Sequence, residues 1–296
     1  MRLRHIEAIQ AVLQAGSFVA AAQRLDLQPD AVQQTLEEAE RQLGFLLFAR
    51  SRDRLMATAE TRALQPAIGN LYDQLEALQR QAHSLRQHHE PALHVDCSAT
   101  LADQLLPQSL AALRRRFRDT PCQLSSQRSA CMVERLLVGY CHVGISLHDP
   151  QHPRLHCVAL GQGKLHLVAP RGWLSAKQKY ISLPALAGQS MVGLEGEDPL
   201  SAQLDSRLQA LQPAPVIQTR VQSYPMMRSM VEAGEGLAVV DPFTAIGARQ
   251  LGLDVCPIAP AMTVTVYALT LAGSSPTSAL KALLAIIEEK VHSLLE

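Results

Sequence analysis

No stretch of the 296 residues approaches the run of about 20 apolar residues that a helix needs to cross a bilayer. The first seven residues, Met1–Glu7, alternate polar and apolar side chains and lack the charged region followed by an apolar run that marks a secretory signal. From these absences we expect a soluble, cytoplasmic protein with no membrane partner.

An excess of charge of either sign is also missing. The chain has 27 basic residues (Lys and Arg) and 27 acidic residues (Asp and Glu), so its formal net charge is zero. A protein that coats nucleic acid indiscriminately draws its affinity from neutralising phosphates, and this composition excludes that class. Any contact with DNA therefore needs a locally arranged surface.

The six cysteines form no C-x-x-C pair and have no suitably spaced histidines nearby. We therefore expect no metal site and no cofactor. Cys97, Cys122, Cys157 and Cys256 fall in or beside strand-like runs, where a small apolar thiol packs well. The pattern favours packing in the core, and a redox sensor is the alternative.

Catalytic motifs are absent as well. The sequence has no G-x-S-x-G, no H-E-x-x-H and no phosphate-binding glycine loop. We therefore expect no catalytic residues, and the sequence does not support an enzyme that uses Ser98 or Cys97 as its nucleophile. The sequence also disfavours a periplasmic-type solute-binding protein, because that hypothesis leaves residues 1–86 unexplained.

What the sequence does contain is an ordinary globular composition, 47% hydrophobic and 18% charged. Its length favours two or three compact units, each with its own core. The expected fold class is a multi-domain α+β chain: an N-terminal winged helix-turn-helix, a long linker helix and a C-terminal α/β domain of two subdomains, similar to periplasmic binding proteins.

The first unit, residues 1–60, reads as three helices and a wing. Apolar periodicity predicts helices over 3–15, 18–25 and 29–43, separated by helix-stopping and helix-starting residues such as Gly16, Pro29 and Gly44. The polar stretch Arg50–Leu55 is typical of a hairpin tip. Together these elements predict the winged helix-turn-helix.

A long linker helix is expected over residues 61–89. Its apolar positions keep a spacing of three and four: Leu64, Ile68, Leu71, Leu75, Leu78, Ala82 and Leu85. A partner helix would cover this seam, so we expect a homodimer or homotetramer formed through it. A simple packed linker is the alternative.

From residue 90 to 296, strand-like runs alternate with amphipathic helices, which favours α/β units on largely parallel sheets. Subdomain one is expected over about 90–161 and 269–296, and subdomain two over about 162–268, with a cleft between them. The expected strands are 93–97, 122–127, 142–146, 164–169, 190–194, 216–221, 237–240 and 263–270. The expected helices are 101–117, 131–138, 200–211, 224–233, 243–250 and 276–295.

A family resemblance extends over the whole chain. In the first 60 residues its motifs are Gly16-Ser17-Phe18, Ala21-Ala22-x-x-Leu25, Ala31-Val32, Glu40, Leu43-Gly44 and Leu47-Phe48-x-Arg50. Further on they are Leu105-Leu106-Pro107, Val143-Gly144-Ile145 and the run Gly236–Pro242. In order and spacing these residues resemble LysR-type transcription regulators. The resemblance implies a regulator that binds double-stranded DNA and answers to a small-molecule effector.

Within that resemblance, the segment Asp241–Ala245 is similar to the branch that answers to opines and basic amino acids. This similarity points to an amino acid or a related carboxylate as effector. The chain departs from the family pattern at Gln28-Pro29-Asp30, where Ser/Thr-Gln-Pro is common, and at Gln33, where Ser is common. It departs again at Met56–Glu60, where Leu-Thr-Pro-Ala-Gly is usual. The side chains that would read bases therefore differ from those common in the family.

The expected DNA contact is made by the start of the helix over 29–43, which would enter the major groove. Gln33 and Gln34 are the candidates for reading bases, because a glutamine amide can bond both N7 and N6 of adenine. Contacts that fix the register without reading sequence are expected from Ser17, Gln28 and the exposed backbone amides at the helix start near Pro29 and Asp30, with Arg50, Arg52 and Arg54 on the wing. The Asp30 carboxylate would face the groove and oppose binding. Seven arginines against eight acidic residues in 1–60 predict weak or strongly salt-sensitive binding. A degenerate head that no longer binds DNA is the alternative.

The resemblance places the effector site between the subdomains, on the turn Ser98-Ala99-Thr100-Leu101 and on the loop Gly193-Leu194-Glu195. Hydroxyls and free amides at a helix start also suit a carboxylate, although plain helix capping is the alternative. Acidic residues (Glu195, Glu197, Asp198, Asp241) would pair with a cationic group, unless they are solvated loop acids. Gln127 and Ser223, at strand ends, complete the candidate set.

Overall fold

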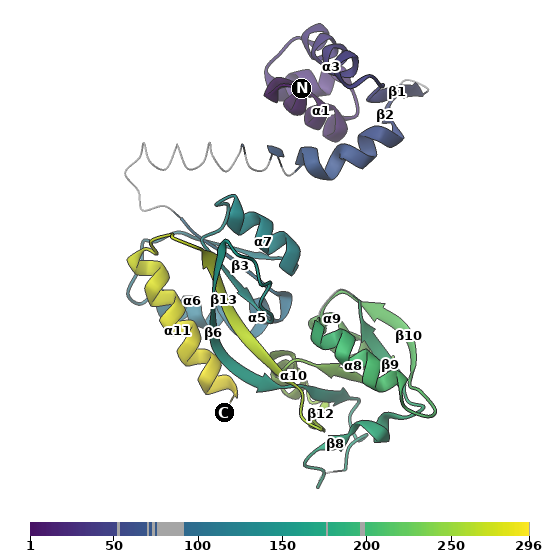
Figure 1. Cartoon of the computed structure of the whole chain (residues 1–296), viewed down its shortest axis with the longest axis vertical. Coiled ribbons are helices and arrows are strands. Elements are labelled where there is room, and N and C mark those ends of the chain that lie inside the picture. Colours follow the sequence, from purple (N-terminus) through teal and green to yellow (C-terminus); the bar gives the residue numbers. More distant parts are fainter. Residues whose placement is uncertain are drawn as a thin grey trace. The chain divides into compact units, whose positions relative to one another are not determined.

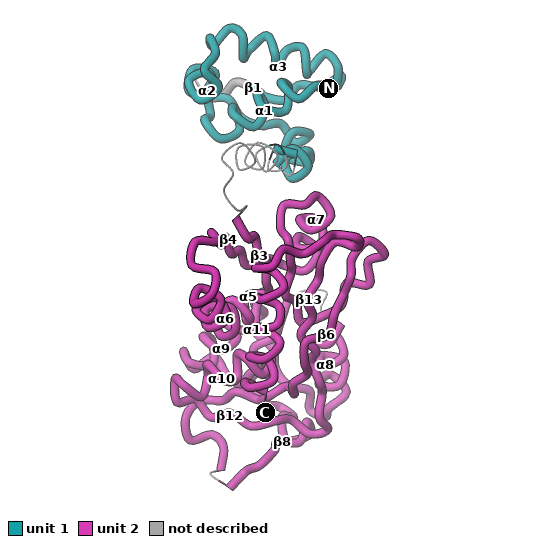
Figure 2. Tube along the Cα trace, turned by 90° about the vertical axis from the view of Figure 1, so that its left-hand side faces the viewer, with its two compact units in different colours: residues 1–89 teal, residues 90–296 magenta. Residues whose placement is uncertain are grey.

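The computed structural model describes residues 1–51, 54–69, 71, 72, 75, 92–175, 177–195 and 199–295. Figure 1 shows the chain, and Figure 2 colours its two compact units, residues 1–89 and residues 90–296. Among the described helices, none combines the length and the apolarity that spanning a bilayer requires. Each unit has an apolar core of its own.

Three helices, α1 (Leu3–Ala15), α2 (Phe18–Leu25) and α3 (Pro29–Leu43), build the first unit, with the bounds expected from sequence. Local chemistry sets these bounds. Gly16 ends α1 with a φ of 70°, and the Ser17 hydroxyl caps α2 by accepting the Ala20 N–H at 3.2 Å. The apolar stripes of the helices meet in one cluster in which Ile9, Ala21 and Ala39 are fully buried.

The wing is the hairpin of β1 (Phe48–Ser51) and β2 (Arg54–Ala57), which run antiparallel. Two side chains anchor its base. Glu40 of α3 accepts the Leu47 N–H at 2.7 Å, and the buried Thr61 hydroxyl donates to the Leu47 carbonyl, also at 2.7 Å. The wing is thereby attached to α3 and to the helix that begins at residue 59.

That next helix is described continuously from residue 59 to 69. Ile68 is buried in the core of the first unit and Leu64 packs against that core, whereas Leu71 is exposed. Leu75 is half-buried, and the other seam positions, Leu78, Ala82 and Leu85, lie outside the described residues. Pairing through the linker therefore stays a prediction.

A five-stranded sheet of order β4-β3-β5-β13-β6 organises the first subdomain of the second unit. Its strands are β3 (Leu93–Cys97), β4 (Cys122–Ser126), β5 (Val143–Ser146), β6 (Leu155–Lys164) and β13 (Thr263–Leu271). Its helices are α5 (Ala99–Gln104), α6 (Leu106–Leu113), α7 (Ser129–Leu137) and α11 (Ser278–Leu295). Strand β3 is parallel to β4 and β5, whereas β13 is antiparallel to β5 and β6.

The second subdomain is built on the order β11-β7-β12-β8 and on the pair β10-β9, which a parallel bridge from Met191 to Leu237 joins to β11. Its strands are β7 (His166–Ala169), β8 (Ile181–Ser182), β9 (Ser190–Leu194), β10 (Val216–Val221), β11 (Ala238–Val240) and β12 (Asp254–Ala259). Its helices are η1 (Leu183–Leu186), α8 (Pro199–Gln209), α9 (Tyr224–Glu232) and α10 (Pro242–Gln250).

Three features of this unit differ from the expectation. Strands β6, β8 and β12 were missed, and the single helix expected over 101–117 is the pair α5 and α6, which meet at Leu105. The sheets are mixed rather than largely parallel, since β7 is antiparallel to both β11 and β12. Strand direction depends on pairing partners far away in sequence, so periodicity does not reveal it.

The chain crosses between the subdomains twice, after β6 and before β13. At the crossing the Leu165 N–H donates to the Met262 carbonyl at 2.9 Å, so the two connections lie side by side (Figure 1). Strands β6 and β13 pair as far as Lys164 and Thr263, and the crossing is displaced from the expected boundaries at 161/162 and 268/269. Leu147 packs against the apolar clusters of both subdomains.

Candidate DNA interface and effector site

The start of α3 is open. Gln28 occupies the N-cap position in an extended conformation, and its side chain makes no capping bond with the described residues. Pro29 follows as the first helical residue, and the side chains of Gln28, Asp30 and Gln34 are exposed within the first unit. An uncapped helix start of this kind presents backbone N–H groups and the positive end of the helix dipole to an incoming anion.

The two glutamines proposed to read bases differ in their surroundings. The Gln33 amide donates to the Glu37 carboxylate at 2.9 Å one turn further along, and the Gln33 side chain is half-buried. Gln34 is exposed. Reading a base with Gln33 requires exchanging its bond to Glu37, so Gln34 is the stronger of the two candidates.

Of the other expected DNA contacts, Ser17 already uses its hydroxyl as the cap of α2. The backbones of Arg50 and Arg54 lie in β1 and β2, while Arg52 and the side chains of all three arginines are outside the described part of the chain. The expectation missed Arg62, an exposed residue whose guanidinium donates to the Ala57 carbonyl at the base of the wing, 2.9 Å away. It lies just past the expected limit of the domain at residue 60.

The effector turn begins at Ser98, directly after β3. Ser98 occupies the N-cap position of α5, yet its Oγ is buried and has no hydrogen-bond partner among the described residues. Plain helix capping does not account for this hydroxyl. A buried hydroxyl that lacks a partner carries a free-energy cost, which a bound ligand atom at this position would relieve.

Thr100 and Leu101 lie deeper in the same turn. Leu101 is fully buried in the apolar core of the first subdomain, and Thr100 is 2% exposed. The Thr100 hydroxyl donates to the Asp241 carboxylate at 2.6 Å. Of the expected hydroxyl contacts in this turn, Ser98 alone keeps its Oγ unengaged.

Asp241 was expected as an open acid facing a cationic ligand, and the structure corrects this. Its carboxylate is fully buried as the cap of α10, where one oxygen accepts the N–H groups of Phe243 and Thr244 at 2.8 and 3.1 Å. The other oxygen accepts the hydroxyls of Thr100 and Thr244, each at 2.6 Å. Burial raises the pKa of the carboxyl, against the opposing effect of these four hydrogen bonds.

The loop of the second subdomain that was expected to contact the effector follows β9. Glu195 is exposed, and its N–H donates to the Val221 carbonyl at 2.7 Å; Glu197 and Asp198 lie outside the described residues. Ser223 caps α9 by accepting the Met226 N–H at 3.4 Å. Glu195 is therefore the acidic candidate that the structure places on the surface.

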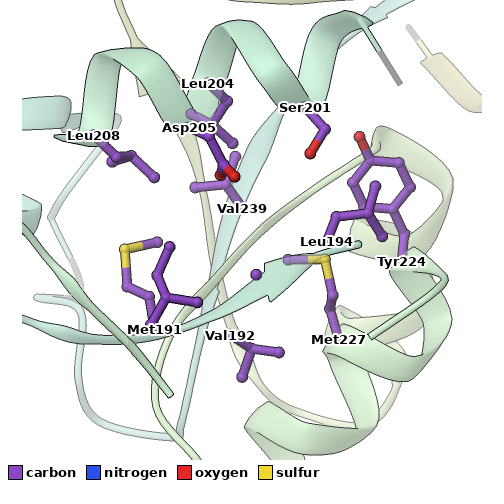
Figure 3. A pocket seen from close by; sticks show the side chains of 12 residues that line it. Met191, Val192, Leu194, Ser201, Leu204, Asp205, Leu208, Tyr224, Met227 and Val239 are labelled. Carbon is purple, nitrogen blue, oxygen red and sulfur yellow. The ribbon is translucent and has the colours of Figure 1, made fainter. Parts of the chain in front are cut away.

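Gly193 and Leu194 line a small pocket inside the second subdomain, between β9, α8 and α9 (Figure 3). Its polar lining comes from Ser201, Asp205 and Tyr224, and the rest is apolar. The cavity holds about 10 Å³, room for about one water molecule and far too little for an amino acid.

Two polar residues that the expectation missed lie with the effector turn. The carboxyl ends of the neighbouring strands β3, β4 and β5 lie at one edge of the sheet. Ser98 comes after β3, Gln127 and Ser129 come after β4, and His148 comes after β5. The Ser129 Oγ and the His148 Nδ1 are 3.5 Å apart. Their positions directly after predicted parallel strands were the available signal.

None of the six cysteines, all of which lie within the described residues, forms a disulfide bond. Burial raises the pKa of Cys97 to about 12 and that of Cys157 to about 12, and Cys256 shifts in the same direction. Thiols with raised pKa values are poor nucleophiles at neutral pH, which argues against a redox sensor. Within the described ranges no cluster of side chains that could hold a metal ion is found.

Comparison with known proteins gives two family matches. Residues 3–62 match the bacterial regulatory helix-turn-helix protein, lysR family, and residues 86–291 match the LysR substrate binding domain. The transcriptional activator protein LysR of Escherichia coli K12 is 29% identical over 269 residues, which are 90% of this chain and 86% of the relative. The HTH-type transcriptional regulator DgcR of a Pseudoalteromonas species is 25% identical over 273 residues, 92% and 93% of the two chains.

Among solved structures, full-length CbnR complexed with its target DNA is similar in fold. The TM-score is 0.72 at 21% identity, and the match covers 99% of this chain and 100% of CbnR. At this level of identity the likeness concerns the fold alone.

Proposed function

Because this chain belongs to the LysR family of helix-turn-helix regulators, we propose that it controls transcription in response to an amino acid or a related small carboxylate. It is a DNA-binding transcription regulator with an effector-binding domain and not an enzyme. The class of effector and the residues that bind it are the proposal.

The observation that carries the effector proposal is the Ser98 Oγ, buried and without a partner at the turn after β3. A carboxylate oxygen placed there would accept this hydroxyl, and the N–H groups at the start of α5 lie next to it. Gln127 and the exposed Glu195 are the further proposed contacts, with Glu195 suited to an ammonium group. Asp241 and Thr100 are left out because they bond each other.

Thermal shift of the full chain against a panel of amino acids and simple carboxylates tests this assignment. We expect at least one compound to raise the melting temperature of the wild type, because binding stabilises the native state. The Ser98→Ala variant should lose the shift, while Ser229→Ala, an exposed hydroxyl on α9, should keep it. No shift from any compound, or an equal shift in Ser98→Ala, contradicts the proposal.

For the DNA contact we propose that α3 enters the major groove and that Gln34 reads a base, with Gln33 beside it. The uncapped start at Gln28, Pro29 and Asp30 would meet a phosphate, assisted by Ser17, Arg50, Arg52 and Arg54. Recovery of genomic fragments bound by the full chain, with and without the compounds of the panel, tests this. Enrichment that is lost in Gln34→Ala supports it, and no enrichment in either condition contradicts it in favour of a degenerate head.

The proposed mechanism joins the two sites. Effector binding would change the angle between the effector subdomains, and linker helices over 61–89 paired between copies would pass this change to the spacing of the DNA-binding heads. Sedimentation of the full chain tests the assembly. A monomer at micromolar concentration would contradict it.

A further inference from the structure

One face of α5 is directed at the second subdomain. Thr100, Asp103 and Gln104 lie at positions i, i+3 and i+4, which fall on the same side of a helix. Opposite them lie the first two turns of α10 and Arg228 of α9. The two subdomains thus meet along α5 through polar side chains.

The inner part of this contact is a buried cluster of Thr100, Asp241 and Thr244. Both hydroxyls donate to the same oxygen of Asp241 at 2.6 Å, and the two hydroxyl oxygens are 2.5 Å apart. An aspartate needs only the two amides of its own helix to act as a cap. The hydrogen bond from Thr100 is not needed for capping, and it connects α5 of the first subdomain to the start of α10.

The start of α10 is also held by apolar contacts on both sides. Phe243 is fully buried in the core of the first subdomain, together with Leu101 and Leu105 of the α5 region. Ala245 and Ala248, further along α10, belong to a core of the second subdomain. The first turn of α10 is therefore embedded in one subdomain while the rest of the helix belongs to the other.

The outer part of the contact is weaker. The Arg228 guanidinium donates to Asp103 at 3.1 Å, and the Asp103 side chain is 47% exposed. A Cβ added at Gly247 would lie 2.5 Å from the Arg228 Nη1, so the glycine permits this close approach. Solvent-exposed ion pairs contribute little, whereas buried hydrogen bonds to a charged group are among the strong ones.

We propose that Asp241 is a positioning residue that ties the effector turn to the second subdomain, with the Thr100 bond as the pivot and the Asp103–Arg228 pair as the part that opens. This rests on the proposed function only in assigning the effector to the turn at Ser98. Thr100 belongs to that turn, two residues after Ser98. A ligand that shifts the turn moves α10 directly, and a rotation of the second subdomain moves the turn.

Hydrogen exchange of the full chain, followed by mass spectrometry without any added small molecule, tests the tie. Thr100→Val keeps the shape of the side chain and removes the hydroxyl. We expect the peptides that cover 98–105 and 241–249 to exchange about tenfold faster, because a buried acceptor loses a donor. Thr100→Ser, which restores the hydroxyl, should return exchange to the wild-type rate.

Asp103→Asn is the matched control, since it alters the outer contacts of Asp103 with Arg228 and Gln104 and leaves the buried cluster unchanged. Its peptides over 241–249 should exchange as in the wild type. Wild-type exchange in Thr100→Val overturns the tie, and so does exchange in Thr100→Ser as fast as in Thr100→Val. If Thr100→Val does not fold, Thr100→Ala replaces it, because alanine also lacks the hydroxyl that donates to Asp241; wild-type exchange in that variant likewise overturns the tie.

The outcome is independent of the effector. Since the measurement uses ligand-free protein, a tie without any thermal shift in the compound panel leaves the inference standing and removes the proposed effector. If instead the thermal shift depends on Ser98 and Thr100→Val does not change hydrogen exchange, the proposed effector site stands and the tie is removed.

Discussion

Two helix starts in this chain share a local design and have opposite surroundings. At α3 a polar residue, Gln28, precedes Pro29 at the first helical position, and at α10 Asp241 precedes Pro242 in the same way. Gln28 is exposed and its side chain caps nothing in the described structure, whereas Asp241 is fully buried with four hydrogen bonds. The open start is available to an external anion, and the closed start holds two parts of the protein together.

The largest expected effect is on the closed start. Asp241→Ala removes the cap of α10 and leaves two hydroxyls and two amides without their acceptor in a buried site. We expect the free energy of unfolding to fall by about 3–5 kcal/mol, because several buried donors lose their partner at once. Urea denaturation measures it, and a loss no larger than that of a surface substitution would break the comparison.

The next effect concerns the open start and DNA. Gln34→Ala should weaken binding to an enriched genomic fragment by about 1–3 kcal/mol, the contribution of a well-placed contact to a base. Its melting temperature should stay that of the wild type, since Gln34 is exposed. Fluorescence anisotropy at fixed salt measures the affinity, with Gln14→Ala on the exposed surface of α1 as control. Equal weakening by both variants would count against base reading.

The pH dependence of the free energy of unfolding should distinguish the buried Asp241 from an exposed acidic residue. Burial raises the pKa of its carboxyl above the usual 3.8, so the native state holds this proton more tightly than the unfolded state. The stability from this group is complete below the unfolded pKa and is lost as pH rises through the folded pKa. Asp241→Asn lacks this loss, so the stability of the variant relative to wild type should increase from pH 4 upward. Urea denaturation at several pH values measures this, and a constant difference would contradict it.

The smallest expected effect comes from a substitution that caps the uncapped start of α3. Gln28→Ser places a short hydroxyl at the N-cap of α3, which should stabilise the first unit by about 0.5–1 kcal/mol. The same hydroxyl would occupy an amide that we assign to a phosphate, so affinity for DNA should fall. Thermal unfolding and anisotropy measure the two changes. Higher stability with unchanged affinity would show that the start of α3 does not meet the backbone of DNA.

The first unit was predictable because its signals are local. The bounds of α1, α2 and α3 follow from Gly16, Ser17, Pro29 and Gly44, each of which acts on its neighbours in sequence. In the second unit, β6 was missed because its exposed and half-buried residues and its two glycines, Gly161 and Gly163, lack a clear apolar stripe. Strand β12 was missed with Pro257 in its middle.

The candidate effector site divides in the same way. Ser98 was predictable as a hydroxyl at the end of a strand that begins a helix, and it is there. Asp241 was predictable as a polar residue after a strand, but its buried hydrogen bonds were not, because one of its donors, Thr100, lies 141 positions earlier. Ser129 and His148 are neighbours for the same reason, through the parallel pairing of the strands before them.

By itself the sequence determined the family, the winged helix-turn-helix with its helix limits, and the order of most strands and helices in the effector domain. Helix caps, apolar periods and turn residues act over a few positions, and these are written in the chain. Only the tertiary structure decided which polar groups are closed and which stay open. Burial and hydrogen-bond partners depend on the packing of distant segments, which leaves Ser98 without a partner and gives Asp241 four hydrogen bonds.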